Sequence, residues 1–567
     1  MAWRSITDFT PGIREILAPN YPLGTLQSNG TYRCFATDTG ALAPLPSRVN
    51  NFFLDSPDIA STEAQLLNLT SPEASILGLH AKNPVFWPGQ TLAGVDQNNT
   101  ELLLGLGYYH TTPGVSTRSV TLFRLMRHHT VPGWQQIWDW SQALDLDLTA
   151  RPPRMTFADG RSNSANPDVG GPVVVGFTVD GRAFMYPDDT NTAATSTRYL
   201  PGDNVLDVDG GGFVYPAHIV AHQGRAVLHP LLLTDGGFQS IYPTNEAFYF
   251  TTANNWTERD ASLDNDDINT FFQLQVGHEH PTGYQVIHSL NASELVMLKS
   301  SGGAIVMQGD LGGSGLRAIA YPSVRSPGLS LNNGTPSPIG LIYPVDGSGI
   351  WLWAGGEQSE HLTPHMNPDF WRPPTTLNDG NPSAYGHGYT SCSTWQDWVV
   401  LPNNYLYDTS TKSLWRYENP AEATHHHVTV DWRGRFMYAA PSGIINVGEA
   451  AVQEYDARYP ASSYQARTQP LALTIDQQLT VHRVGIVASG AGRVTLTPTT
   501  RQNPVGQPVT FEVGAEDAPL WRRTQNVNVS GSHITFTVNS AGVTDSSPAP
   551  TVHEILWDDD TSTPERQ

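Results

Sequence analysis

The sequence predicts an all-β protein: an irregular β-propeller-like array of hairpins with an N-terminal arm and a C-terminal β-sandwich. First, an alternating apolar and polar phrase that turns at a glycine occurs twice, as "VVVGFTVDGRAFMYP" at 173–187 and "HHVTVDWRGRFMYAA" at 426–440. Second, 43 Pro, 51 Gly and only 15% charged residues are typical of many short strands and loops. Third, the last hundred residues are a succession of alternating strands.

Residues 1–110 are predicted to form an N-terminal arm or platform segment laid over other structure, because they mix turns with short extended pieces. Inside this segment, Ser71 followed by Pro72 and Glu73 has the pattern of a helix start, with proline at the first helical position. We therefore expect a short helix from there to about His80.

Residues 111–465 are predicted to form the β-propeller-like region. Near its start, Trp134, Ile137 and Trp138 can share one face of a helix, while Trp138 and Trp140 fit a strand equally well. In either conformation, the aromatic cluster indicates a core or a subunit interface.

Further hairpins are predicted in this region at Gly224, at Gly302 and Gly303, at 346–349, at 403–404 and at 407–415. Such hairpins at intervals of tens of residues favour a propeller, in which each sheet covers the apolar face of its neighbour. We interpret the twin phrases as equivalent hairpins from different sheets. The alternative is an ordinary β-rich enzyme whose hairpins look alike because Asp-Gly and Asn-Asn are good turns.

Residues 466–567 are predicted to form the β-sandwich, with the tail from Asp558 onward frayed. The alternating positions predict its interior as Val484, Ile486, Val494, Leu496, Phe511, Val513, Val527, Val529, Ile534, Phe536 and Val538.

The formal net charge of −22 argues against a function that depends on gripping nucleic acid, since such binding needs a basic face. It allows transient passage of DNA through a channel with acidic walls. The 31 basic residues include only three lysines, and this preference for arginine suits interfaces, although a GC-rich genome gives the same bias. With two cysteines, no transmembrane segment and no signal-peptide pattern in the sequence, we expect a protein made in a cytoplasm.

No residue is predicted to be catalytic, to bind a cofactor or to bind a metal. His278 and His280 can share a strand face with His288 nearby, but no third ligand has a metal-site spacing, and the consecutive His425–His427 alternate between faces. The stretch "YDTSTKSLWRY" at 407–417 approaches the Asp-box of propeller sialidases but lacks its glycine. The sequence therefore predicts no enzymatic activity and no cofactor.

The opening from Asp8 to Pro46, "DFTPGI…NYPLGTLQSNGTYRCFATDTGALAPLP", followed by loosely repeated hairpins and a closing sandwich, resembles tail proteins of double-stranded DNA phages. It is most similar in layout to the tail tubular or nozzle proteins of short-tailed phages and to propeller-bearing minor tail proteins. The resemblance implies a structural virion protein, assembled in the host cytoplasm as a homo-oligomeric ring, a hexamer, around the DNA channel. Its implied partners are an adaptor ring and fibres.

Two other functions fit the same fold. A propeller glycoside hydrolase would have paired carboxylates in an axial funnel, and a receptor- or carbohydrate-binding propeller would have shallow aromatic pockets.

Overall fold

The structure is a computed structural model, and it contains strands without any helix in the part of the chain that it describes. The described residues are 2–15, 21–54, 73–82, 101–109, 119–126, 134–140, 156–162, 171–177, 183–186, 198–199, 207–208, 212–234, 240–244, 247–253, 255–259, 272–273, 284–299, 302–311, 317–325, 334–345, 348–366, 392–401, 404–419, 427–431, 433–440, 445–446, 450–472, 478–514, 521–531 and 533–562.

Within these residues, seven antiparallel sheets follow one another along the chain as the blades of a propeller. Blade 1 contains β5 (Glu73–Lys82), β6 (Glu101–Tyr109), β7 (Ser119–Met126) and β8 (Trp134–Trp140), with β34 (Ile445–Asn446) beside β5. Blade 2 contains β9 (Thr156–Ser162), β10 (Gly171–Phe177), β11 (Ala183–Tyr186) and β12 (Arg198–Tyr199), and blade 4 contains β20 (Tyr284–Asn291), β21 (Glu294–Lys299), β22 (Ala304–Gln308) and β23 (Arg317–Tyr321). Between them, blade 3 contains β13 (Asp207–Val208), β14 (Gly212–His222), β15 (Arg225–Thr234), β16 (Ser240–Thr244), β17 (Ala247–Thr252), β18 (Asn255–Arg259) and β19 (Phe272–Gln273).

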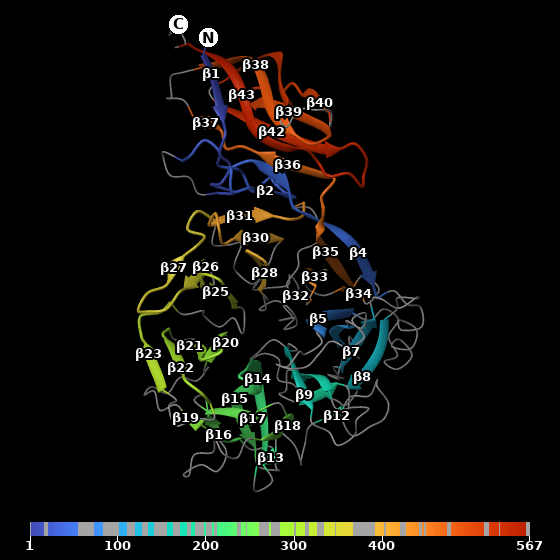
Figure 1. The fold of residues 1–567 in the computed structure, drawn as a ribbon, viewed down its shortest axis with the longest axis vertical. Coiled ribbons are helices and arrows are strands. Elements are labelled where there is room, and N and C mark those ends of the chain that lie inside the picture. The colour runs from blue at the N-terminus through green and yellow to red at the C-terminus, as the bar shows by residue number, and fades with distance from the viewer. Residues whose placement is uncertain are drawn as a thin grey trace.

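The last three blades lie closest to the sandwich (Figure 1). Blade 5 contains β24 (Thr335–Ser337), β25 (Gly340–Val345), β26 (Gly349–Trp353) and β27 (Glu360–His361). Blade 6 contains β28 (Ser393–Trp395), β29 (Trp398–Leu401), β30 (Tyr405–Asp408) and β31 (Ser413–Arg416). Blade 7 contains β32 (His427–Val430), β33 (Arg435–Ala440), β35 (Ala451–Pro460) and β4 (Pro46–Phe53).

The propeller is a closed ring. Its inner strands β5, β9, β14, β20, β24, β28 and β32 each contact the next, and β32 contacts β5. Blade 7 contains three strands from the end of this region and one, β4, from the N-terminal part of the chain, with Gln453 opposite Asn51. Since β4 comes about 400 residues earlier in the sequence than β35, this pairing joins the two ends of the propeller. The predicted propeller-like fold is confirmed.

Both ends of the chain build the β-sandwich, at the opposite end of the molecule from blade 3 (Figure 1). One sheet has the order β2 (Cys34–Ala36), β3 (Leu42–Pro44), β43 (Thr551–Ser562), β38 (Gln478–Ser489) and β41 (Trp521–Gly531), with β1 (Ala2–Ile6) paired to β43. The other has the order β36 (Ser463–Arg467), β42 (His533–Gly542), β39 (Gly492–Thr500) and β40 (Val509–Val513), with β37 (Leu471–Ala472) paired to β42. All eleven predicted interior residues are buried, from 0% to 6% exposed, which confirms the sandwich.

Two described N-terminal segments, residues 9–15 and 21–33, which we call the strap, are bonded to both halves of the molecule. On the propeller side, the amide of Ile13 donates to the carbonyl of Leu414 at 2.9 Å. On the sandwich side, the amide of Tyr32 donates to the carbonyl of Gln465 at 2.9 Å. Phe9 is fully buried in one apolar core that runs from the sandwich into blades 5, 6 and 7. The two halves are therefore packed as one body.

The predicted helix ending near His80 is wrong, because residues 73–82 form strand β5, paired with β6 along its whole length. A register shift between Ile76 and Gly78 lets Ile76, Leu79 and Ala81 all be buried. This β-bulge gives the strand an apolar spacing of three residues, as in a helix. Trp134 and its neighbours also form a strand, β8.

The twin phrases are hairpins from different blades, but they are not equivalent. The phrase at 426–440 forms β32 and β33, the first and second strands of blade 7. The phrase at 173–187 contains β10 and β11, the second and third strands of blade 2. Their likeness reflects shared hairpin chemistry and not a shared position in the repeat.

The strand pairing differs from the predicted domains 1–110, 111–465 and 466–567. β5 and β6 pair with the propeller strands β7 and β8, while β1, β2 and β3 belong to the sandwich. The predicted fraying of the tail is wrong for residues 558–562, which belong to strand β43. Asp558 in this strand is 0% exposed and binds Arg483 with an Nη2–Oδ2 distance of 2.6 Å.

Candidate functional site: a charged cleft between propeller and sandwich

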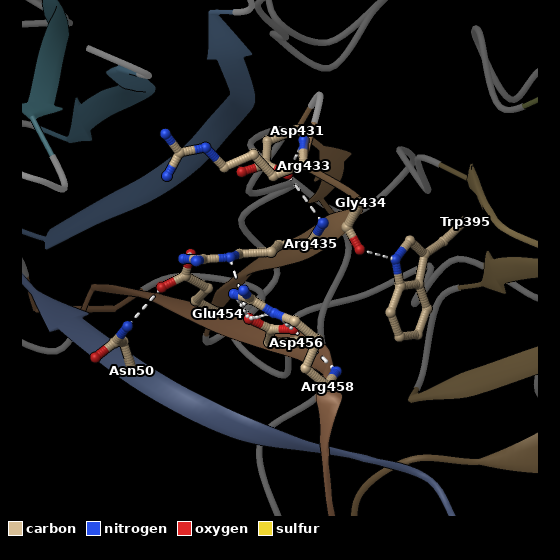
Figure 2. Close-up of polar contacts among 9 residues, drawn as sticks. All are labelled: Asn50, Trp395, Asp431, Arg433, Gly434, Arg435, Glu454, Asp456 and Arg458. Atoms are coloured by element: carbon tan, nitrogen blue, oxygen red, sulfur yellow. Dashed lines mark hydrogen bonds and ion pairs between the residues drawn. The ribbon is translucent and has the colours of Figure 1, made fainter. Parts of the chain in front are cut away.

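A group of buried, ion-paired charges lies on blade 7 (Figure 2). Arg435 of β33 donates from Nη1 to Glu454 at 2.9 Å, and its Nε lies 3.2 Å from Oδ2 of Asp456. Both carboxylates come from β35 and are almost fully buried. Because a buried carboxylate is costly without a partner, this arginine compensates the burial of both side chains.

Asn50 of the neighbouring strand β4 and Arg458 of β35 itself complete the network. Asn50 of β4 donates from Nδ2 to Oε2 of Glu454 at 2.5 Å, and Arg458 donates from Nη2 to Oδ2 of Asp456 at 2.5 Å. Donors from β4 and from the end of β35 thus bind these two carboxylates.

A second pair crosses from the strap to blade 6. Arg33 donates to Oε2 of Glu418 from Nε at 2.9 Å and from Nη2 at 2.6 Å, and the hydroxyl of Tyr455 donates to Oε1 at 2.6 Å. Glu418 is 1% exposed, so these donors hold its charge in the interior.

The β32–β33 turn positions Arg435. Oδ1 of Asp431 accepts from the backbone amides of Arg433 and Arg435, each at 2.9 Å, and Gly434 adopts a left-handed φ of 74°. The indole N–H of Trp395, from blade 6, donates to the carbonyl of Gly434 (Figure 2). The aspartate and glycine of this phrase therefore fix the turn and tie it to the next blade.

The pKa values follow from these contacts. The hydrogen bond from Arg458 lowers the pKa of Asp456, which opposes a role as a proton donor near neutral pH. Burial, followed by the charge of Glu418, raises the pKa of Tyr455 well above its usual value. Both groups are held in one protonation state.

These residues border a cleft of about 800 Å³. Its walls come from β4, from the end of β35, from residues 460–463 that lead into β36, and from Asp545, Ser546 and Pro548 of the sandwich. We call it the junction cleft. Tyr459 is 55% exposed and lines it, so the cleft presents an aromatic ring and guanidinium groups to solvent.

A second, aromatic cleft of about 720 Å³ lies on another side of the same junction. Phe35 of β2 and Trp398 of β29 line it, with ring centroids 5.2 Å apart at 76°. Val543 of the sandwich is 68% exposed beside them.

Polar side chains also link the inner strands of adjacent blades. Nε2 of His80 lies 3.0 Å from Oδ1 of Asp159, and Nδ1 of His222 lies 2.8 Å from Oγ of Ser289. Each pair joins consecutive blades, blade 1 to blade 2 and blade 3 to blade 4, so these contacts hold neighbouring blades together.

Of the histidines singled out in the sequence, the structure describes His288 and His427. His288 lies on β20, where burial lowers its pKa to about 4. His278, His280, His425 and His426 lie outside the described residues, as do the first two residues of the 346–349 turn. Among the described residues, no three His, Cys, Asp or Glu side chains gather as metal ligands. The same part of the chain contains no helix able to span a membrane.

The Asp-box likeness at 407–417 has a structural basis. Oδ1 of Asp408 accepts from the amide of Ser410 at 2.8 Å, and the indole of Trp415 donates to Ser413 at 2.7 Å. Lys412 takes the left-handed conformation, with φ of 53°. A lysine thus stands where this kind of turn favours glycine.

Sequence reasoning missed the charged network. The signal was present in "VQEYDARYP", where Glu454, Asp456 and Arg458 alternate and so lie on one face of a strand. Their partners Asn50 and Arg435 could not be found in this way, because they come from other segments of the chain.

No known protein-family profile and no curated protein matches the chain. Solved structures with similarity include an exo-β-1,3-galactanase from Phanerochaete chrysosporium with galactose, at 11% identity, TM-score 0.23 and coverage of 80% of this chain and 93% of that one. YCF48 bound to D1 peptide has 12% identity, TM-score 0.32 and coverage of 72% and 99%. A glycoside hydrolase family 43 arabinoxylan arabinofuranohydrolase from Bacillus subtilis has 8% identity, TM-score 0.27 and coverage of 85% and 96%.

Two of these three structures are enzymes that act on glycosides. This finding corrects the expectation of a protein without enzymatic activity, which we withdraw. At such TM-scores the similarities assign no activity or ligand to this chain.

Proposed function

We propose that this chain is a structural component of a tailed-phage virion, of the nozzle or hub type, that joins neighbouring proteins through a stiff propeller–sandwich body. The observation that carries the proposal is the continuous apolar core from the sandwich into blades 5, 6 and 7. A body built in this way resists bending between its halves, as a permanent assembly requires. The phage layout of residues 8–46 supports the same proposal, since the strap lies within this stretch.

The net charge of −22 fits a ring around DNA, because acidic walls repel phosphates and let the polymer pass. In this proposal the subunits form a homo-oligomeric ring, a hexamer, that contacts the adaptor and the fibres.

The proposal is tested by the mass of the purified chain in solution and by negative-stain images. We expect rings of uniform size. A monomer at all concentrations, with no ring in the presence of the adaptor protein, would contradict the proposal.

A second candidate, a carbohydrate-binding propeller, is favoured by the aromatic cleft. The ring of Trp398, beside Phe35, is the kind of apolar platform that packs against a sugar face. A glycan array, with sugar release measured in parallel, separates the two candidates. A bound glycan that is lost in Trp398→Ala supports this one.

A further inference from the structure

The junction cleft has an open strand edge along one wall. In the part of the chain that the structure describes, β4 pairs with β35 alone. Five consecutive residues of β4, Pro46–Asn50, line the cleft, so the edge of the strand and not only one face borders it. An exposed edge offers backbone donors and acceptors to an added strand.

Next to this strand, the end of β35 has the composition of a binding hot spot. The side chain of Arg458 is 65% exposed and uses only Nε and Nη2 for Asp456, and among described residues nothing bonds its Nη1. Its guanidinium lies 5.8 Å from the centroid of the exposed Tyr459 ring. Exposed arginine and tyrosine are enriched at the centres of protein interfaces.

The charges that face solvent in the cleft favour an acidic partner. The buried carboxylates of Glu418 and Asp456 are already bound by arginines, so they attract no further cation. Arg48 and Arg458 are exposed, against one exposed carboxylate, Asp545.

We propose that the junction cleft binds an extended, acidic segment of a partner polypeptide, which adds a strand to β4 and places a carboxylate on Arg458. This interaction does not depend on whether the chain belongs to a virion. The segment would rest on the propeller and the sandwich at once, so a partner would read both halves of the body.

The test is fluorescence anisotropy with a labelled 12-residue peptide of alternating Glu and Thr, added to the full-length protein. We expect binding, no binding of the Lys and Thr counterpart, and loss of binding when alternate backbone nitrogens of the Glu peptide are methylated. Arg458→Ala and Tyr459→Ala should each weaken binding at least about fivefold, as expected for hot-spot residues.

The matched control is Arg493→Ala. Arg493 is similarly exposed at 62% and paired to Glu512, but it does not line the cleft. Tyr459→Ala removes no partner of a buried carboxylate, so it keeps the test valid if Arg458→Ala does not fold. Absence of binding by the Glu peptide, an equal loss in Arg493→Ala, or unchanged binding of the methylated peptide would each overturn the proposal.

Discussion

At the scale of single residues, Arg435 is the partner shared by Glu454 and Asp456. We expect Arg435→Ala to destabilise the protein by about 3–5 kcal/mol, because it leaves two buried carboxylates with fewer donors. Arg493→Ala should cost about 0–1 kcal/mol, since that pair is exposed. Denaturant unfolding measures both, and similar losses in the two variants would show that the buried network adds no stability.

Asp456 gives a prediction about pH. Its hydrogen bond from Arg458 lowers its pKa below the usual 3.8, so its charge stabilises the folded state above that value. This contribution is lost as the pH falls through the folded pKa. We expect the Tm of Asp456→Asn to depend less on pH below about 4 than that of the parent protein. The matched variant Asp545→Asn should follow the parent, and an equally steep fall in Asp456→Asn would refute this role.

At the scale of elements, the packing of blade 2 on blade 3 depends on a glycine. A Cβ on Gly160 of β9 would lie 2.1 Å from Cδ2 of the buried Trp256 on β18. We expect Gly160→Ala to destabilise the protein by at least about 1–3 kcal/mol through overpacking. Gly434→Ala meets no atom within 4 Å and should cost only about 1–2 kcal/mol for its left-handed backbone. Thermal unfolding of both ranks them, and the reverse order would contradict the packing.

Strand β4, which completes blade 7, gives a second prediction at this scale. Removal of residues 1–54 deletes β4 from blade 7 and three strands from the sandwich. We expect a chain that unfolds without a cooperative transition, because blade 7 and the shared core are both left open. A cooperative transition at the parent Tm in the shorter chain would show that closure is not needed.

Local patterns in the sequence predicted the local elements. Turn glycines such as Gly224 and Gly303 located the hairpins, and alternation located interior residues such as Phe536. The helix near residue 73 failed because a capping pattern contributes only about 1 kcal/mol, while the bulged strand buries Ile76 and Leu79.

Such local patterns could not predict the candidate site. Asn50 and Glu454 meet only when the ring closes, and no periodicity relates strands that are some 400 residues apart. The number of blades was hidden for the same reason, since the last blade takes its fourth strand from the other end of the chain.

At the scale of the whole molecule, the strap, the ion pairs and the shared core make the propeller and the sandwich one unit. We expect a single calorimetric transition for the full-length protein, because neither half can unfold without exposing part of the other's core. Two transitions, with the sandwich melting apart from the propeller, would contradict this coupling.

A cryo-electron microscopy reconstruction of the purified full-length protein tests the central claim most directly. The account predicts seven blades closed by β4 of the same chain, with a sandwich built from both ends, in subunits arranged around a ring. An open array of sheets, or a sandwich that occupies variable positions relative to the propeller, would contradict it.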